Sequence, residues 1–184
     1  MVRGTVFLSA FLLTACGPRF PSIQPVQAGE AKLSGPDGNV SFISLLSEKP
    51  VSLVFFGYTH CPDFCPATMH RLGETVAALS DSQKAKLTVI FISVDPARDT
   101  PRIAADYARK FHPMIRGYTG DSKEIASMLR LYRRLDVVPD VANGKPYLVD
   151  HTTSILWFEN QKHSKNIPAS FVVSDLLADL KQVL

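Results

Sequence analysis

VSLVFFGYTHCPDFCP, residues 51–66, is the stretch that places two cysteines between an apolar run and a helix-like segment. Residues 51–56 are short, apolar and rich in strand-forming side chains, a composition typical of a strand buried on both faces. Pro66 suits the first turn of a helix, and a helical pattern continues to about residue 79. The spacing therefore predicts a strand-to-helix turn that carries Cys61 and Cys65, with Cys65 near the N-cap.

Thiols at the start of a helix are chemically active. The exposed N–H groups and the dipole of a helix N-terminus lower the pKa of a nearby cysteine. Thiolates bind soft metals and carry out disulfide exchange. The pair is therefore consistent with a metal site, a redox pair or a structural disulfide. The structural disulfide is disfavoured, because so small a closed loop contributes little chain-entropy stabilisation.

The composition is that of an ordinary globular domain with short extensions. The chain has 184 residues, of which 46% are hydrophobic, so it can bury a full core without disulfide bridges. The net charge is +3, and the Lys and Arg residues form no dense cluster, so we expect no nucleic-acid partner. No second Cys/His pair with finger-like spacing is present in the sequence, which excludes a zinc finger.

The first fifteen residues have the pattern of an export signal. Arg3 supplies a positive charge, and residues 6–13 form an apolar segment that is too short to span a bilayer. The sequence LTAC, residues 13–16, is similar to the lipobox of bacterial lipoproteins, in which diacylglycerol alkylates the cysteine thiol. We therefore expect residues 1–15 to be a lipoprotein signal peptide and Cys16 to be the lipidated N-terminus, with an ordinary secretory signal as the alternative.

The segment that follows is rich in proline and lacks hydrophobic periodicity. Residues 16–30 are therefore predicted to be the lipidated N-terminus and a flexible tether, and residues 31–184 to be the folded domain. Export of a lipidated chain places the domain in the bacterial cell envelope, on the extracytoplasmic (periplasmic) side. That compartment is oxidising, so a pair such as Cys61 and Cys65 tends towards a disulfide unless a metal holds it.

Strand and helix patterns alternate through the domain. A turn signal at residues 36–39 predicts an opening β-hairpin between residues 31–33 and 40–42. The later predicted elements are a buried strand at 87–94, a helix at 100–111, a short strand at 116–119, a helix at 122–134, paired strands at 147–149 and 154–158, and a helix at 174–183. This order predicts an α/β fold, a three-layer sandwich with a mixed sheet, and a thioredoxin-like fold fits both the order and the position of the thiols.

The spacing of the cysteines suits a metal that has one further ligand. CxxxC has one residue more than the CxxC of thiol oxidoreductases, which makes room for a metal between the sulfurs. Two thiolates alone can hold Cu(I), whereas Cu(II) also prefers nitrogen donors. His151 lies beside Asp150 between two predicted strands, in a loop that a thioredoxin-like sheet places next to the cysteine turn. We therefore favour His151 as the third ligand.

The other histidines, and two aspartates within residues 93–101, are not expected to bind the metal. His60 adjoins Cys61 but is expected to point outward. The remaining histidines are expected to be solvated: His70, His112 and His163. Asp95 ends a predicted buried strand and is expected to face the cysteine site, where its charge would influence thiol protonation. Asp99 is expected to cap the helix that follows or to form an ion pair within the loop.

Three motifs together resemble the Sco/SenC family: GYTHCPDFCP at 57–66, SVDPARDTP at 93–101 and YLVDH at 147–151. The resemblance runs from about residue 28 to the C-terminus, and the motifs have the order and about the separation that they have in the family. It implies a membrane-tethered thioredoxin-like domain that binds one copper, as Cu(I) or Cu(II), through Cys61, Cys65 and His151. Members of the family deliver copper to the dinuclear copper site in subunit II of cytochrome c oxidase, or keep the thiols of that site reduced.

The resemblance leaves two functions open. The first is a metallochaperone, rather than an enzyme, whose partner is cytochrome c oxidase subunit II or a related copper-site protein. The alternative is an extracytoplasmic thiol-disulfide oxidoreductase, in which Cys61 and Cys65 are the catalytic, redox-active pair. A peroxidase of the peroxiredoxin type is disfavoured, because Tyr58 stands three residues before Cys61, where that class carries Thr.

Overall fold

The structure is a computed structural model that describes residues 17–132 and 154–184. Its strands are β1 (Ser22–Gln27), β2 (Lys32–Gly35), β3 (Gly38–Ser41), β4 (Val51–Gly57), β5 (Leu87–Ser93), β6 (Ile115–Gly120), β7 (Ser154–Glu159) and β8 (Lys162–Pro168). Its helices are α1 (Phe42–Ser47), α2 (Phe64–Ala77), α3 (Asp81–Lys84), α4 (Pro101–Arg109), α5 (Ser122–Leu131) and α6 (Val173–Val183). Cys16, Asp150 and His151 lie outside the described residues.

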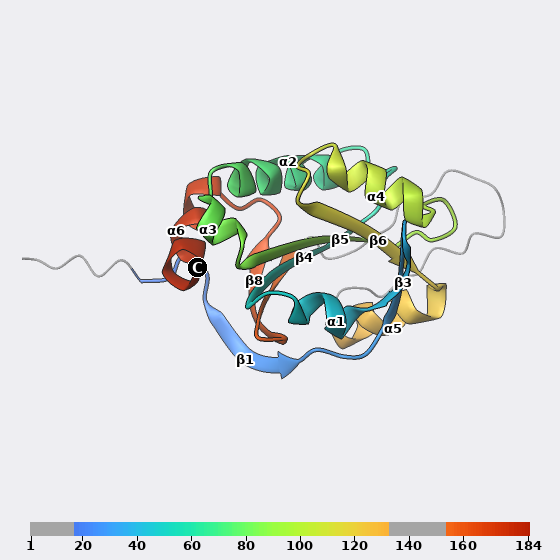
Figure 1. Ribbon diagram of the computed structural model, residues 1–184, viewed down its shortest axis with the longest axis horizontal. Coiled ribbons are helices and arrows are strands. Elements are labelled where there is room, and N and C mark those ends of the chain that lie inside the picture. The colour runs from blue at the N-terminus through green and yellow to red at the C-terminus, as the bar shows by residue number, and fades with distance from the viewer. Residues whose placement is uncertain (1–16, 133–153) are drawn as a thin grey trace, which may run out of the picture.

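The strands form one open sheet in the order β1-β8-β7-β4-β5-β6-β2-β3. β4, β5 and β6 are parallel, and the pairs on either side of them are antiparallel. Figure 1 shows α2 and α4 on one face of the sheet and α1 and α5 on the other, while α6 packs against α2. The predicted three-layer α/β sandwich with a mixed sheet is confirmed.

The centre of the sheet is built from the two apolar runs of the sequence. Every residue of β4 and β5 is buried, and the strands pair in parallel from Val51–Leu87 to Gly57–Ser93. Parallel neighbours need a crossover connection, and α2 follows β4 while α4 follows β5. The carboxyl ends of β4 and β5 therefore lie side by side, and so do the loops that lead into α2 and α4.

The predicted opening hairpin is present as β2 and β3, which pair from Lys32–Ser41 to Gly35–Gly38. Gly38 has a φ of 118°, a conformation that side chains rarely adopt, so glycine permits the turn. β2 also pairs with β6, and the hairpin thereby extends the sheet. The short helices α1 and α3 were not predicted, because each is too brief to show a helical period.

The N-terminal segment is bound to the domain, in contrast to the flexible tether predicted for residues 16–30. β1 pairs with β8 at the edge of the sheet. The backbone N–H groups of Arg19 and Phe20 donate to the carboxylate of Asp179 on α6, at 2.6 and 3.1 Å. β1 contains Pro25 and little apolar alternation, which an edge strand tolerates. Its formation therefore depends on its partners rather than on a pattern of its own.

β7 and β8 form an antiparallel hairpin with a two-residue tip. The last pair is Glu159–Lys162, and the tip residues Asn160 and Gln161 have φ values of 47° and 66°. Positive φ at both central positions is the pattern of a type I′ turn, whose twist matches that of the strands. Asn suits the first position, whereas Gln at the second carries a steric cost that glycine would not.

His163 is buried within β8, so the prediction of a solvated residue in a polar loop is wrong. Its ring packs against Tyr132 and Phe158, with ring centroids 5.5 and 5.4 Å away, and its Nε2 lies 3.1 Å from the carbonyl of Lys165. β8 is buried by the N-terminal segment and α6, which no local pattern of polar residues reveals. The predicted strand at 147–149 lies outside the described residues, and β7 pairs with β4 and β8.

Replacing Gln161 with Gly is expected to raise the free energy of unfolding by about 0.5–1 kcal/mol, because relief of the left-handed strain exceeds the added entropy of the unfolded chain. Urea unfolding followed by the fluorescence of Trp157, the single tryptophan, measures the change. Lys162→Gly, at the adjacent strand position, is the matched control and is expected to lower stability by a similar amount. A Gln161→Gly variant no more stable than the parent would contradict the assigned turn.

Candidate functional site

The two cysteines lie where β4 leads into α2, at the carboxyl end of the central strands. Cys61 is partly exposed in the loop, Cys65 is buried in the first turn of α2, and both are free thiols. The predicted strand-to-helix turn is confirmed. The helix begins at Phe64 rather than at Pro66, and Asp63 occupies the N-cap.

A sulfur atom accepts the hydrogen bond that a side-chain cap would otherwise take at the start of α2. Asp63 makes no side-chain cap hydrogen bond. The backbone N–H of Cys65 instead donates to Sγ of Cys61 at 3.4 Å. The N–H of Cys61 donates in turn to the carbonyl of Tyr58 at 3.3 Å, which closes the loop. These two hydrogen bonds fix the position of Cys61 relative to Cys65.

The sulfur of Cys65 is packed beneath the loop. Cys65 is 0% exposed, and a Cβ on Gly57 would lie 3.0 Å from its sulfur, so glycine leaves the room that the thiol needs. Burial raises the pKa of the Cys65 thiol, and a hydrogen bond to the backbone of Tyr58 opposes this rise. The neighbouring Cys61 and, to a smaller extent, the charge of Asp99 raise the pKa further. The thiol is therefore protonated at neutral pH, and a metal that binds it must displace the proton.

Asp99 is an acidic residue that contacts the cysteine loop. Its carboxylate is completely buried and accepts the N–H and the hydroxyl of Thr59, at 2.8 and 2.5 Å. The capping role predicted for Asp99 is wrong, because the N-cap of α4 is Thr100, whose hydroxyl accepts the N–H of Ile103. With Thr100 as the cap, the side chain of Asp99 is directed to the neighbouring loop.

Asp95, which was predicted to face the cysteine site, is buried and forms an ion pair with Nε of Arg98. The guanidinium of Arg98 lies over the ring of Tyr58, 5.8 Å from its centroid. Asp95 thus contacts Arg98, whose guanidinium covers Tyr58 of the loop, and the charge of Asp99 contributes to the raised pKa of the Cys65 thiol. The position after a buried strand does not by itself distinguish Asp95 from Asp99, because both residues share it.

The side chain of His60 is 54% exposed, in agreement with the outward position predicted for it. Its Nδ1 nevertheless lies 3.1 Å from the hydroxyl of Thr59 and 3.5 Å from the carboxylate of Asp99. His70 is exposed, as predicted, and lies 3.5 Å from Glu74 on the next turn. His112 is half-buried rather than solvated, and its Nδ1 accepts the N–H of the residue two positions later at 3.1 Å.

The third predicted ligand, His151, lies outside the described residues, as does the predicted lipidation site Cys16. Within residues 17–132 and 154–184, no three His, Cys, Asp or Glu side chains gather as a metal site. The described part of the site is a dithiol of one accessible and one buried sulfur. Its soft donors fit a soft metal ion, and a nitrogen ligand would have to come from another segment.

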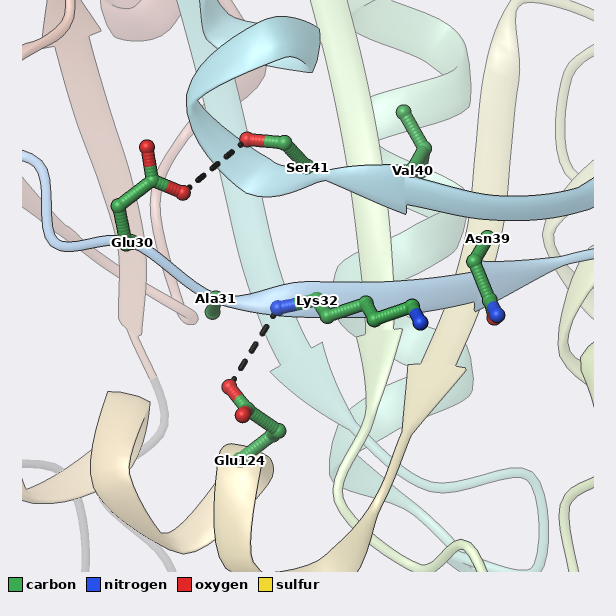
Figure 2. Close-up of a pocket in the computed structure, with 7 residues that line it drawn as sticks. All are labelled: Glu30, Ala31, Lys32, Asn39, Val40, Ser41 and Glu124. Carbon is green, nitrogen blue, oxygen red and sulfur yellow. Dashed lines mark hydrogen bonds between the residues drawn. The ribbon is translucent and has the colours of Figure 1, made fainter.

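A separate pocket of about 350 Å³ lies between the β2–β3 hairpin and α5. Figure 2 shows that its two carboxylates have different partners: Glu30 accepts from the hydroxyl of Ser41, and Glu124 accepts from the backbone N–H of Lys32, each at 3.4 Å. No residue of the cysteine loop lines this pocket. It forms no part of the dithiol site.

Comparison with known proteins finds a matching family model and similar proteins. The sequence model of the SCO1/SenC family matches residues 47–184, about three quarters of the chain. The mitochondrial protein SCO2 of Saccharomyces cerevisiae is 41% identical over 102 residues, which are 55% of this chain and 34% of that protein. The matched region spans less than half the length of the first curated relatives.

Solved structures share the fold. The apo Sco1 protein of Thermus thermophilus has a TM-score of 0.79 and 29% identity, over 88% of this chain and 94% of that one. The ScoI structure of Bradyrhizobium japonicum, described with copper bound, has a TM-score of 0.73 and 34% identity, over 86% of this chain and 100% of that one. The predicted thioredoxin-like class is consistent with both.

Proposed function

The chain belongs to the SCO1/SenC family, and from this premise we propose that it is a membrane-anchored copper chaperone. Its copper is cargo, delivered to the dinuclear copper site of cytochrome c oxidase subunit II or to a related copper-site protein during maturation. The Sco family is one of cytochrome c oxidase assembly proteins. In this role the chain is a metallochaperone rather than an enzyme.

The observation that carries the proposal is the unequal dithiol of Cys61 and Cys65. Thiolates are the soft donors that Cu(I) prefers. A partly exposed Cys61 allows a thiolate of a partner to approach the metal, so copper can pass by exchange of ligands. The B. japonicum structure, 34% identical, supports the assignment because it is described with copper bound.

His151 completes the proposed ligand set. The motif YLVDH places an imidazole after a predicted strand, and the family resemblance assigns the third copper ligand to this position. A nitrogen donor beside two sulfurs allows the site to hold Cu(II) as well as Cu(I). In this proposal Cys61, Cys65 and His151 hold one copper ion in either oxidation state.

The proposed anchor is a diacylglycerol group on the thiol of Cys16, which becomes the N-terminal residue when residues 1–15 are removed. Acyl chains would then hold the domain at the extracytoplasmic surface of a membrane of the bacterial cell envelope. None of the helices in the described ranges, 17–132 and 154–184, has the length and apolar character needed to cross a bilayer. Mass spectrometry of the N-terminal peptide of the membrane-extracted chain tests the lipid directly.

A thiol-disulfide oxidoreductase is the second candidate, and the difference in exposure between the free thiols favours it. The Cys61 thiolate would attack a partner disulfide and form a mixed disulfide, and the first partner thiol would leave. Cys65, after losing its proton to solvent, would attack the Cys61 sulfur of the mixed disulfide and release the second partner thiol. The Cys61–Cys65 dithiol is then oxidised by two electrons as the partner disulfide is reduced. Neither step needs His151 or copper.

Incubation with the soluble copper-site domain of cytochrome c oxidase subunit II separates the two functions. The chain loaded with Cu(I) is expected to transfer copper to the reduced domain, and the His151→Ala variant to lose most of this transfer. The copper-free chain is incubated in parallel with the oxidised domain, and partner thiols are counted. Copper transfer no faster than from a Cu(I)–glutathione complex would contradict the chaperone proposal, whereas disulfide reduction unaffected by His151→Ala would favour the oxidoreductase.

A further inference from the structure

The carboxylate of Asp99 is the centre of a hydrogen-bond network behind the cysteine loop. Its Oδ2 accepts the N–H of Thr59 at 2.8 Å and the hydroxyl of Ser93 at 2.5 Å. Its Oδ1 accepts the hydroxyl of Thr59 at 2.5 Å and lies 3.5 Å from Nδ1 of His60. These donors belong either to the cysteine loop or to the last residue of β5. The carboxylate therefore joins the loop to the central sheet.

Burial makes this network strong. The side chain of Asp99 is 0% exposed, and a carboxylate removed from water is costly unless donors surround it. Hydrogen bonds to a charged acceptor are stronger than neutral ones, so each donor is held firmly. Thr59 is held twice, by its N–H and by its hydroxyl, and it lies two residues before Cys61.

A continuous series of contacts leads from Asp99 to the thiol pair. After Thr59, the N–H of Cys61 donates to the carbonyl of Tyr58, and the N–H of Cys65 donates to Sγ of Cys61. The other end of the loop is fixed by the N–H of Val94, which donates to the carbonyl of Gly57 at 2.8 Å. Movement of Thr59 would therefore shift the sulfur of Cys61 away from the start of α2.

We propose that Asp99 is a positioning residue for the thiol pair: it anchors Thr59 to the end of β5 and thereby keeps Sγ of Cys61 on the N–H of Cys65. Asp99 itself holds no copper. The role applies to the copper-free, reduced protein, and only a readout that uses bound copper rests on the proposed function.

Amide hydrogen exchange of the full chain, reduced and free of copper, tests this role. Asp99→Asn keeps the shape of the side chain but removes the charge and places an NH₂ group against the donors. The N–H of Cys65 is expected to exchange at least about tenfold faster in the variant. The amides of Leu53 and Phe91, in β4 and β5, are expected to change only as far as global stability changes.

Thr59→Val is a milder second variant, which deletes one donor and leaves Asp99 charged. It is expected to accelerate exchange of the Cys65 amide in the same direction, and the double variant to show less than the sum of the two effects. Thr59→Ser retains both donors and is the matched control, with exchange expected to stay unchanged. Exchange at Cys65 that accelerates no more than at Leu53, in both Asp99→Asn and Thr59→Val, would overturn the proposal.

The thiolate-to-Cu(II) charge-transfer band is the second readout, because its energy and intensity depend on the position of the sulfurs. Asp99→Asn is expected to alter the band, and Asp175→Asn, which changes an exposed carboxylate on α6, to leave it unchanged. An unaltered band in Asp99→Asn would count against the role. A parent chain that binds no copper would refute the proposed function while the exchange result stood.

Discussion

Cys61→Ser combined with Cys65→Ser is expected to lower the affinity for Cu(I) by at least about a thousandfold, which corresponds to about 4 kcal/mol of binding free energy. The physical reason is the loss of both soft donors, since a serine hydroxyl neither deprotonates at neutral pH nor suits Cu(I). Competition with a chromophoric Cu(I) chelator measures the affinity of the reduced chain. The metal-free variant is expected to remain folded, at a cost of about 1–2 kcal/mol for the buried hydroxyl at position 65.

His151→Ala separates the nitrogen ligand from the thiols. The variant is expected to lose the thiolate-to-Cu(II) charge-transfer band. It is expected to keep more of the Cu(I) affinity than the double serine variant does, because two thiolates can hold Cu(I) without the imidazole. His70→Ala is the matched control, since His70 is exposed on α2 and lies beside Glu74. Equal behaviour of the two histidine variants would remove His151 from the ligand set, and copper affinity retained in the double serine variant would refute the dithiol site.

The central elements of the fold could be predicted because their signals are local. β4 and β5 are apolar runs that are buried along their whole length, which is the pattern of inner parallel strands. The start of α4 is marked by a capping Thr100 followed by Pro101, and the structure uses both. Elements that carry their own burial and capping signals were therefore found, with ends displaced by one or two residues.

The edge of the sheet could not be predicted because its strands are specified by their partners. β8 is an inner strand although its sequence is polar, and Lys165 and His163 within it are both buried. β1 covers one edge of β8, and Asp179 on α6 provides the partner for Lys165. Such burial follows from contacts between residues far apart in the sequence, and hydrophobic periodicity contains no information about them.

The candidate site was predictable to a similar extent. The thiol turn followed from the spacing of Cys61 and Cys65, and the structure places both where expected. The network behind it was not found, because Asp99 contacts Thr59 across forty positions of sequence. A signal was available: Thr100 is a sufficient cap for α4, which left the carboxylate of Asp99 without a local role.

Asp179→Ala is expected to lower the free energy of unfolding by about 3–5 kcal/mol, since it leaves a buried charge without its partner. The carboxylate of Asp179 is 0% exposed and lies 3.4 Å from Nζ of Lys165, whose side chain is 8% exposed. It also accepts the N–H groups of Arg19 and Phe20, so its loss frees the N-terminal segment as well. Urea unfolding measures the change, and Trp157 reports it, because Nζ of Lys165 lies 4.5 Å from the centroid of its ring.

Two further variants identify the cause of this loss. Asp175→Ala removes the neighbouring carboxylate of α6, which is 43% exposed and 3.9 Å from Nε of Arg19, and it is expected to cost at most about 1 kcal/mol. Asp179→Leu combined with Lys165→Met removes both buried charges and is expected to recover part of the stability, about 1–3 kcal/mol. Recovery would show that the unpaired ammonium of Lys165 contributes to the loss, because the N–H groups of Arg19 and Phe20 still lack their acceptor in the double variant. If Asp179→Ala lowered the free energy of unfolding no more than Asp175→Ala, the contacts of Asp179 with the N-terminal segment and β8 would not stabilise the fold as their geometry indicates.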